Sequence, residues 1–297
     1  MSGFMEVVQN SKDYHSLVAK WSKKHADIQK QIVDKHGLVL SKIFDRTKGY
    51  TAATVGGLLL LTTTYLQPPD VLSQKSDKPI TISIDKRFFL VHDLEPYIPD
   101  DVRLLTSEEE ATISAILARD LGISITPEIE GKRLERSYGY IGAEQHLMRY
   151  PGDTMGTHFD SPSEASEYWS SGMAPGRGAW GYFSPSALEF SEKDKQREKY
   201  YIAVQTFLSP DYNQRTAEYR DFFKFRKMLL VNPHNGKAIV TVIGDVGPAV
   251  WTGKHLGGSP EVMKHLERVD GRQKGPVLFL FIDDPKDSVP LGPIDIQ

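Results

Sequence analysis

Apolar and polar residues follow two periods along the chain, one typical of helices and one typical of strands. In residues 11–36 apolar side chains recur at three- and four-residue steps, which predicts an amphipathic helix with lysines on its other side. A capping box at Thr106 and Glu109, with a stop at Gly122, predicts a helix over residues 107–121. β-Rich runs predict strands at residues 80–84, 200–208, 227–231, 237–243 and 277–282.

Turn and capping residues divide the second half of the chain. Asn235-Gly236 lies between two of the predicted strands and predicts a hairpin. Ser191 begins a charged helix that ends near Lys199, and Ser259-Pro260 begins another that runs to about Glu267.

One stretch, Tyr50–Leu66, contains no charged residue. As a helix it is roughly 25 Å long, against about 30 Å for the hydrocarbon core of a bilayer. Residues 11–48 hold nine Lys/Arg and four Asp/Glu, whereas residues 67–297 hold 27 and 34. The positive-inside rule then predicts a single-pass anchor, with the N-terminus in the cytoplasm and residues 67–297 outside. A buried helix of a soluble protein is the alternative.

The basic helix that precedes this stretch has two interpretations. It fits a helix lying on an anionic inner leaflet, because its lysines gather opposite its apolar side. It equally fits a solvated helix or a self-association seam, and the pattern does not separate these.

Composition narrows the chemistry. The 297 residues are 39% hydrophobic and 25% charged, which is typical of a globular protein. Cysteine is absent, which excludes disulfide scaffolds, zinc–cysteine sites, iron–sulfur clusters and thiol catalysis. A net charge of −3 gives the whole chain no nucleic-acid signature, so no nucleic-acid partner is expected.

A series of motifs in the C-terminal third follows a fixed order. They are Asn235-Gly236-Lys237, Ile239-Val240-Thr241-Val242, Asp245-Val246-Gly247-Pro248, Gly253-Lys254 and the helix from Ser259 to Leu266, preceded by the run Gly178–Tyr182. This series resembles the core of double-psi β-barrels of the rare-lipoprotein-A family, over about residues 180–282. The resemblance implies a six-stranded barrel shared with expansins and with certain lytic transglycosylases and endoglucanases, which act on or bind cell-wall glycans.

The expected fold is therefore α+β, mainly β. We expect a basic amphipathic helical cytoplasmic segment and a transmembrane anchor, then a linker and a small α+β block of unassigned role. A loop with the double-psi barrel follows. The corresponding residues are 1–48, 49–67, 68–79, 80–150 and 151–297.

Asp245 is the candidate catalytic acid. Glycosidic cleavage needs a group that protonates the leaving oxygen, and partial burial raises the pKa of a carboxyl towards that task. The alternative is a turn in which Asp245 bonds its own backbone. Two partners that the family carries, a histidine and a second acid, are replaced here by Val204 and Gly257. Hydrolysis needs two carboxyls, so only a lytic transglycosylase with one acid/base fits Asp245 alone.

Other residues are candidates for supporting roles. His158 and Asp160 lie two residues apart, face one side of an extended segment and are weaker catalytic candidates. A metal held by His158, Asp160 and another histidine is a minor alternative, and no metal or other cofactor is expected. Glu144 and His146 form an acid/base pair by composition only. The candidate glycan-binding residues are Trp180, Tyr182, Trp251 and His255, with Trp169 as a further stacking platform.

The sequence thus predicts a membrane-anchored, extracytoplasmic protein that binds cell-wall peptidoglycan through its barrel. The first alternative is a peptidoglycan-cleaving enzyme of the lytic transglycosylase kind, with Asp245 as acid/base. The second is a non-glycan interaction scaffold. The identity of the glycan and the oligomeric state stay open.

Overall fold

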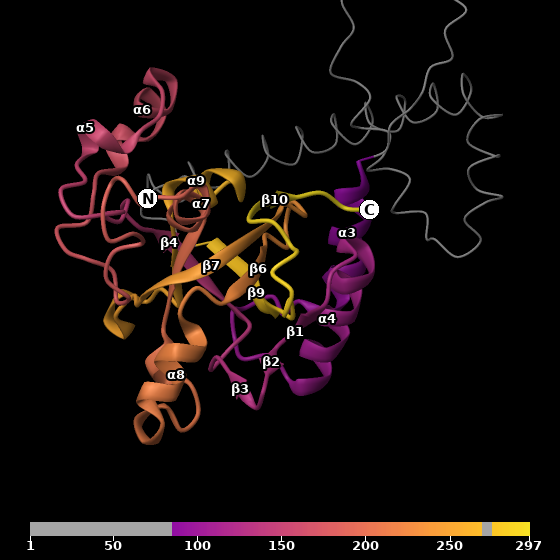
Figure 1. Cartoon of the computed structure of the whole chain (residues 1–297). Helices are drawn as coiled ribbons and strands as arrows, with labels where there is room; N and C mark the ends of the chain where they lie inside the picture. The colour runs from indigo at the N-terminus through magenta and orange to yellow at the C-terminus, as the bar shows by residue number, and fades with distance from the viewer. Residues whose placement is uncertain (1–84, 269–274) are drawn as a thin grey trace, which may run out of the picture. The chain divides into compact units, whose positions relative to one another are not determined.

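A computed structural model describes residues 85–268 and 275–297, which belong to one compact unit (Figure 1). Its helices are α3 Lys86–Leu94, α4 Ser107–Leu121, α5 Met155–His158, α6 Pro162–Tyr168, α7 Glu192–Lys199, α8 Thr216–Phe223 and α9 Pro260–His265. Its strands are β1 Ile125–Thr126, β2 Glu128–Ile129, β3 Lys132–Arg133, β4 Tyr138–Ala143, β5 Tyr201–Val204, β6 Lys227–Val231, β7 Ala238–Val246, β8 Leu256–Gly258, β9 Gly275–Ile282 and β10 Gly292–Ile294.

The predicted membrane segment lies outside the described residues, as do the basic helix, the linker and the strand expected at 80–84. Within 85–268 and 275–297, every helix is too short or too polar to cross a bilayer.

Six strands close into a mixed barrel in the C-terminal part of the chain. The order around it is β9-β4-β8-β5-β7-β6, and β6 pairs with β9 to complete the ring. β4 with β8 and β5 with β7 are parallel pairs, and the other four are antiparallel. The arrangement is compatible with a double-psi barrel. β1 extends β9 and β10 extends β7 outside the ring.

Alternation along the strands separates the barrel interior from its outer face. Leu230, Ile239 and Phe279 belong to the interior cluster, whereas their neighbours Leu229 and Leu280 belong to the outer one. Both faces of β6, β7 and β9 are therefore buried, which explains their nearly continuous apolar sequence. The outer cluster packs against α3 and α4, which stand beside the barrel (Figure 1).

Several sequence-based elements are confirmed. α4 has the predicted bounds, with the capping box at Thr106 and a left-handed Gly122 at its end. β6 and β7 pair as the predicted hairpin. Ser191 caps α7, and Ser259 caps α9, which ends slightly earlier than expected. These elements depend on local chemistry, and local chemistry is what a sequence pattern records.

The start of the barrel differs from the sequence-based expectation. Its first strand is β4, from the segment assigned to a separate block, whereas Gly178–Tyr182 forms a turn closed by a Gly178–Gly181 bridge. The strand expected over 200–208 ends at Val204. β4 lacks a clear strand pattern because a glycine stands at position 139 in place of a β-branched or aromatic residue. Only glycine fits there, since a Cβ at Gly139 would lie 2.8 Å from Cβ of His255.

Candidate metal centre

Three side chains with metal-ligating atoms meet in the connection between β4 and β5. His146 follows β4, His158 ends α5 and Glu198 lies in the last turn of α7. One ligand atom from each lies within 4.8 Å of the others, and all three residues are buried. Nε2 of His158 is 3.2 Å from Oε2 of Glu198, and Nδ1 of His146 is 3.6 Å from Oε1. Two atoms about 2.1 Å from one ion at a tetrahedral angle are about 3.4 Å apart, so this spacing fits a single ion.

Local backbone structure brings these residues together. The N–H of His146 donates to the carbonyl of Gly172 at 3.0 Å, which holds the chain after β4 against the segment that follows α6. Reciprocal bonds between Ser191 and Asp194 begin α7. The helix then places Glu198 in its last turn, where the side chain is buried while most of the helix surface is polar.

A second layer of bonds orients the ligating groups. Nδ1 of His158 lies 3.1 Å from Oδ2 of Asp153. Arg149 holds Asp153 through Nε at 2.9 Å and Nη2 at 3.0 Å. The N–H of Leu147 donates to Oε1 of Glu198 at 3.0 Å. Metal-ligating histidines usually carry such a carboxylate on their other nitrogen, because it fixes the tautomer and the ring.

The electrostatics keep the carboxylates ionised. Burial raises the pKa of Glu198, but the imidazoles of His146 and His158 outweigh burial and lower it to about 2. Burial lowers the pKa of His158, but bonds with Asp153 and Glu198 raise it to about 9. Asp153 is likewise held below its usual pKa against burial, by His158 and Arg149. Without a metal, a protonated His158 bridges two carboxylates.

His146 is the member of the cluster that the protein itself leaves unsatisfied. Its side chain is fully buried, and neither ring nitrogen has a hydrogen-bond partner among the described residues. Phe159 and Tyr168 meet its ring edge to face, at centroid distances of 5.4 and 6.3 Å. A buried polar atom without a partner costs about 1–3 kcal/mol, and a metal ion is one partner that removes this cost. Two imidazoles with one carboxylate form the donor set of hydrolytic zinc sites and of non-haem iron sites.

The centre is part of a larger polar layer on the outer face of β5. Tyr201, on that face, is buried and donates its hydroxyl to the carbonyl of Gln145. Burial raises the pKa of Tyr201 well above its usual value. The negative charges of four nearby carboxylates raise this pKa further, namely those of Glu198, Glu144, Asp245 and Glu261.

Glu261 is the most perturbed carboxyl of this layer. It lies in the first turn of α9, is 7% exposed, and its Oε2 has no hydrogen-bond partner among the described residues. Burial first, and then the charge of Glu198, raise its pKa to about 8. A carboxyl poised near neutral pH is suited to proton transfer.

Asp245 lies at the end of β7 and fastens a loop to the barrel. Its Oδ1 accepts the backbone N–H groups of Ala179 and Val246, at 2.6 and 2.8 Å. Burial raises its pKa although these two bonds lower it. Asp245 thus combines the loop-fastening role weighed as the alternative with the raised pKa expected of an acid.

Glu144 was noted by composition only, and the structure gives it a place. Gly257 stands where the family motif has its second acid. The carboxylate of Glu144 lies against this glycine, so close that a Cβ at position 257 would collide with it. Burial raises the pKa of Glu144, against the effect of Lys254, whose Nζ is 3.3 Å from Oε1. Both Asp245 and Gly257 pair with Ala203 of β5, so they face one side of the sheet about 10 Å apart.

The structure separates His158 from Asp160. The segment expected to be extended is helical up to His158, so the two side chains do not share a face. His158 is buried in the candidate metal centre, whereas Asp160 forms an ion pair with Lys195 near the surface. Asp160 therefore lies outside the candidate set, and Glu198 is the carboxylate beside the two histidines.

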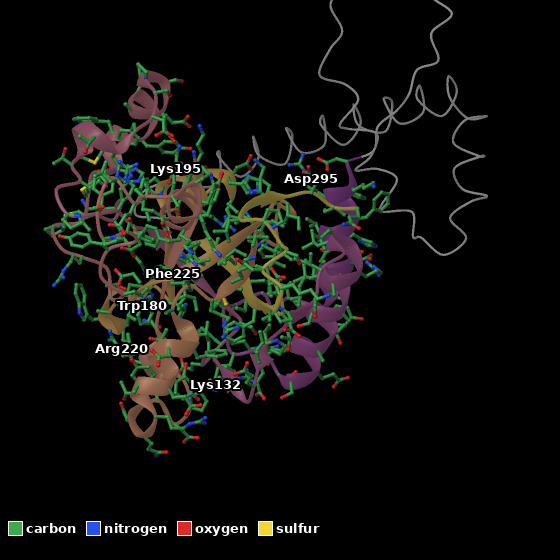
Figure 2. All side chains as sticks on the ribbon, viewed as in Figure 1. Lys132, Trp180, Lys195, Arg220, Phe225 and Asp295 are labelled. Carbon is green, nitrogen blue, oxygen red and sulfur yellow. The ribbon has the colours of Figure 1, made fainter. Side chains whose placement is uncertain are left out.

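The predicted glycan-binding residues have four different surroundings. Trp180 packs against the barrel interior, donates Nε1–H to the carbonyl of Ile243 at 3.1 Å and lies under the guanidinium of Arg220 at 5.4 Å (Figure 2). Tyr182 lies beside Arg177 at 5.7 Å.

Trp251 is exposed to solvent, whereas His255 is held by contacts with the barrel. Trp251 is 88% exposed in the turn after β7. Nδ1 of His255 accepts the N–H of Tyr140 at 2.9 Å, and its ring stacks on that tyrosine. Of the four, Trp251 has the most exposed ring.

Sequence reasoning missed Glu198 and Asp153, and it noted His146 by composition only, as an acid/base partner of Glu144 and not as a metal ligand. Glu198 stands in the run EKDKQREK, which is typical of a solvated helix. The available signal was weak: two histidines twelve residues apart around a capped turn, followed by a capped helix.

Comparison with known proteins provides no template. No family model, no curated protein and no solved structure matches the chain. Function is therefore inferred from the side chains and contacts of this chain.

Proposed function

We propose that this protein is a metal-dependent hydrolase with a mononuclear centre at His146, His158 and Glu198. The observation that carries the proposal is the convergence of these three buried groups with ligand atoms within 4.8 Å of one another. A divalent ion held by these three residues would supply a Lewis acid able to polarise a substrate carbonyl and to activate water.

The protein's own residues fit distinct tasks in such a centre. Asp153 holds the proton of His158 at Nδ1, which directs the Nε2 lone pair into the centre. Arg149 keeps Asp153 in place through its two bonds. Glu261, with a pKa of about 8 and an unpartnered oxygen, holds its proton at neutral pH and is suited to donate it to a leaving group.

An aromatic series connects the centre with the surface. Trp169 is 54% exposed, Phe159 lies 6.3 Å from it, and Phe159 in turn lies 5.4 Å from the ring of His146. Indole rings stack well on sugars and on other flat groups. Trp169 therefore offers a stacking surface for a substrate at the exposed end of this series.

Metal binding tests the proposal directly. The full chain, stripped with a chelator, is titrated with Zn²⁺ or Co²⁺ by calorimetry. We expect one ion per chain, and stabilisation of about 4 kcal/mol at a thousandfold excess over Kd. His158→Ala and Glu198→Gln should remove binding, whereas His234→Ala, at an exposed histidine, should retain it. Absence of binding, or equal binding by all variants, overturns the proposal.

The second candidate function is cleavage or binding of a peptidoglycan by a rare-lipoprotein-A-like barrel. It is favoured by the raised pKa values of Asp245 and Glu144 on one side of the sheet and by the exposed ring of Trp251. In this view the chain is anchored through Tyr50–Leu66 with its barrel outside the cell membrane.

One assay separates the two functions. Purified peptidoglycan is incubated with the protein, and soluble muropeptides and bound protein are both measured. If chelator and Glu198→Gln both abolish release of muropeptides, the metal centre is supported. If Asp245→Asn abolishes release and chelator does not affect the wild type, catalysis by the barrel acid Asp245 is supported. Binding without product, weakened in Trp251→Ala, supports a glycan-binding protein.

A further inference from the structure

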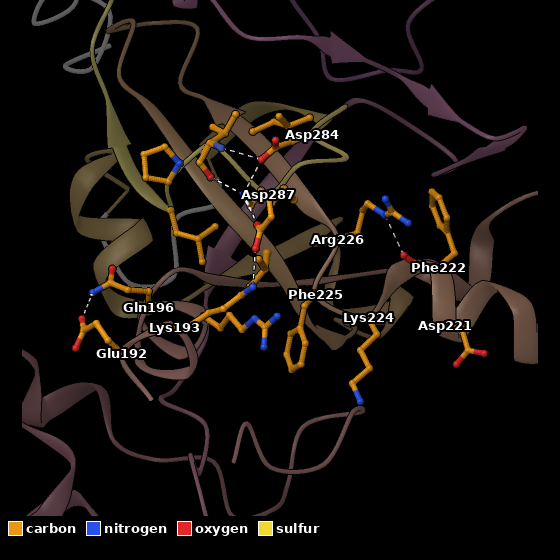
Figure 3. Close-up of a pocket in the computed structure, with 17 residues that line it drawn as sticks. Glu192, Lys193, Gln196, Asp221, Phe222, Lys224, Phe225, Arg226, Asp284 and Asp287 are labelled. Atoms are coloured by element: carbon orange, nitrogen blue, oxygen red, sulfur yellow. Dashed lines mark hydrogen bonds and ion pairs between the residues drawn. The ribbon is translucent and has the colours of Figure 1, made fainter. Parts of the chain in front are cut away.

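A pocket of about 790 Å³ lies between α7, the turn that follows α8 and the segment between β9 and β10 (Figure 3), and His146, His158 and Glu198 are not among the residues that line it. Pockets of about 300–1,000 Å³ are the usual size for small-molecule ligands. Its lining includes the apolar side chains of Val289 and Leu291 as well as two arginines and two phenylalanines.

Two guanidinium groups in this pocket are positioned by aromatic rings. The guanidinium of Arg197 lies 4.5 Å from the ring centre of Phe225. That of Arg226 lies 4.3 Å from the ring centre of Phe222, and its Nε–H donates to the carbonyl of the same residue at 3.1 Å. Stacked guanidiniums keep their N–H edges free to donate and have little freedom left to lose on binding.

The backbone holds this arrangement in an uncommon conformation. Phe225 has φ of 55°, which is rare for a bulky residue. Two backbone bonds to Ile243 of β7 enclose it, one from the N–H of Phe225 and one to the carbonyl of Arg226, both 3.0 Å. The ring also stacks on Phe183 at 5.5 Å. The Phe225 ring that Arg197 stacks on is thus held by its own backbone and by its contact with Phe183.

Two acids of the pocket are paired with lysines of the same pocket and not with its arginines. Asp284 and Asp287 bind Lys227, and Asp287 also binds Lys193. Among the described residues, Arg226 has no carboxylate within ion-pair distance, and Arg197 has a single long contact of 3.3 Å with Asp194.

Glu192 bonds Gln196 at 2.8 Å, and Asp221 is exposed. Lys224 adds a third cation near Phe225, at 5.7 Å from its ring. Five cations and four acids line the pocket, so a net charge of +1 remains there together with apolar side chains.

We propose that this pocket binds a small organic anion, in which a carboxylate, phosphate or sulfate is attached to an apolar ring. The anion lies between Arg197 and Arg226, where guanidinium edges donate paired bonds. The ring lies against Val289 and Leu291. This inference stands independently of the metal centre.

Calorimetry with matched probes tests it on the full chain. The probe is 1-naphthyl phosphate, with inorganic phosphate and 1-naphthol as its two halves. We expect saturable one-to-one binding of the whole probe, and at least about tenfold weaker binding of either half. Arg197→Gln and Arg226→Gln should each weaken binding by about 10- to 100-fold, the worth of a charge-assisted bond. Lys286→Gln, at an exposed lysine beside the pocket, should leave it unchanged.

Folding is checked by circular dichroism, and Lys224→Gln, at an exposed side chain, provides a variant with little structural risk. A several-fold loss of affinity in Lys224→Gln also supports the site. Equal binding by wild type and by folded arginine variants overturns the proposal. Equal binding of inorganic phosphate and 1-naphthyl phosphate overturns the role of the ring.

Discussion

The barrel is covered on two sides by segments of opposite chemistry. α3 and α4 stand on one side, and the connection that carries α5 and α6 lies on the other (Figure 1). The helices bury Leu90, Leu94, Ile113, Leu117 and Leu121. The connection between β4 and β5 buries His146, Arg149, Asp153, His158 and Glu198.

The two sides have different physical requirements. Apolar packing is non-directional, so many combinations of side chains of similar volume satisfy it. Buried charges lose their hydration and break even only when each has a partner in good geometry. The cluster of buried titratable groups is a candidate functional site, because its charges lose hydration without an evident gain in stability. The apolar packing of α3 and α4 is explained by its contribution to stability alone.

Truncation on the apolar side is expected to have the largest effect on stability. Leu117→Ala removes a fully buried side chain from α4 and should lower the free energy of unfolding by about 2–5 kcal/mol in urea titrations. Leu188→Ala, at a side chain that is 98% exposed, is the control and should stay within about 0.5 kcal/mol. Zn²⁺ affinity should not change in Leu117→Ala. A large change in affinity would show that the two sides are coupled.

On the polar side, Glu261→Gln should change the pH dependence of stability. A pKa raised from 4.5 to about 8 means that the folded state holds a proton that the unfolded state releases between these values. The stability of the wild type therefore falls as pH rises from about 5 to 8. Glutamine lacks this titration, so the variant should gain on the order of 2–4 kcal/mol relative to wild type across that interval.

The measurement is urea unfolding at several pH values with chelator present. Glu128→Gln, at an exposed position, is the matched control and should show no such trend. A constant difference between Glu261→Gln and wild type at all pH values would contradict the burial of an ionisable group.

Predictability from sequence follows the same division. α4, α7 and the β6–β7 hairpin were predictable because caps and turn residues lie within a few positions of the element that they begin or end. β4 was missed because its glycines are required by side chains distant in sequence, such as His255 against Gly139.

The candidate site depends almost wholly on contacts distant in sequence. Glu198 meets residues 40 to 52 positions earlier, and nothing in its own helix distinguishes it from its solvated neighbours. Glu144 likewise lies against Gly257 only through the parallel pairing of β4 and β8. The chemistry of single residues was visible in the sequence, but their partners were not.

The smallest expected effect comes from removing a helix cap. It compares the apolar and the polar side of the barrel directly, because the same kind of substitution can be made in α4 and in α7. α4 and α7 each begin with a capping box, at Thr106 and at Ser191. Thr106→Ala and Ser191→Ala each remove the bond that caps a backbone N–H, and Ser191→Ala also removes the bond from Oγ to Asp194. Each should lower the free energy of unfolding by about 1 kcal/mol in urea. α4 carries no metal ligand, whereas the last turn of α7 carries Glu198. Only Ser191→Ala should therefore weaken Zn²⁺ binding, by several-fold, as fraying of α7 loosens that carboxylate. Equal Zn²⁺ affinity in both variants would mean that Glu198 is held by its own contacts and not by its helix.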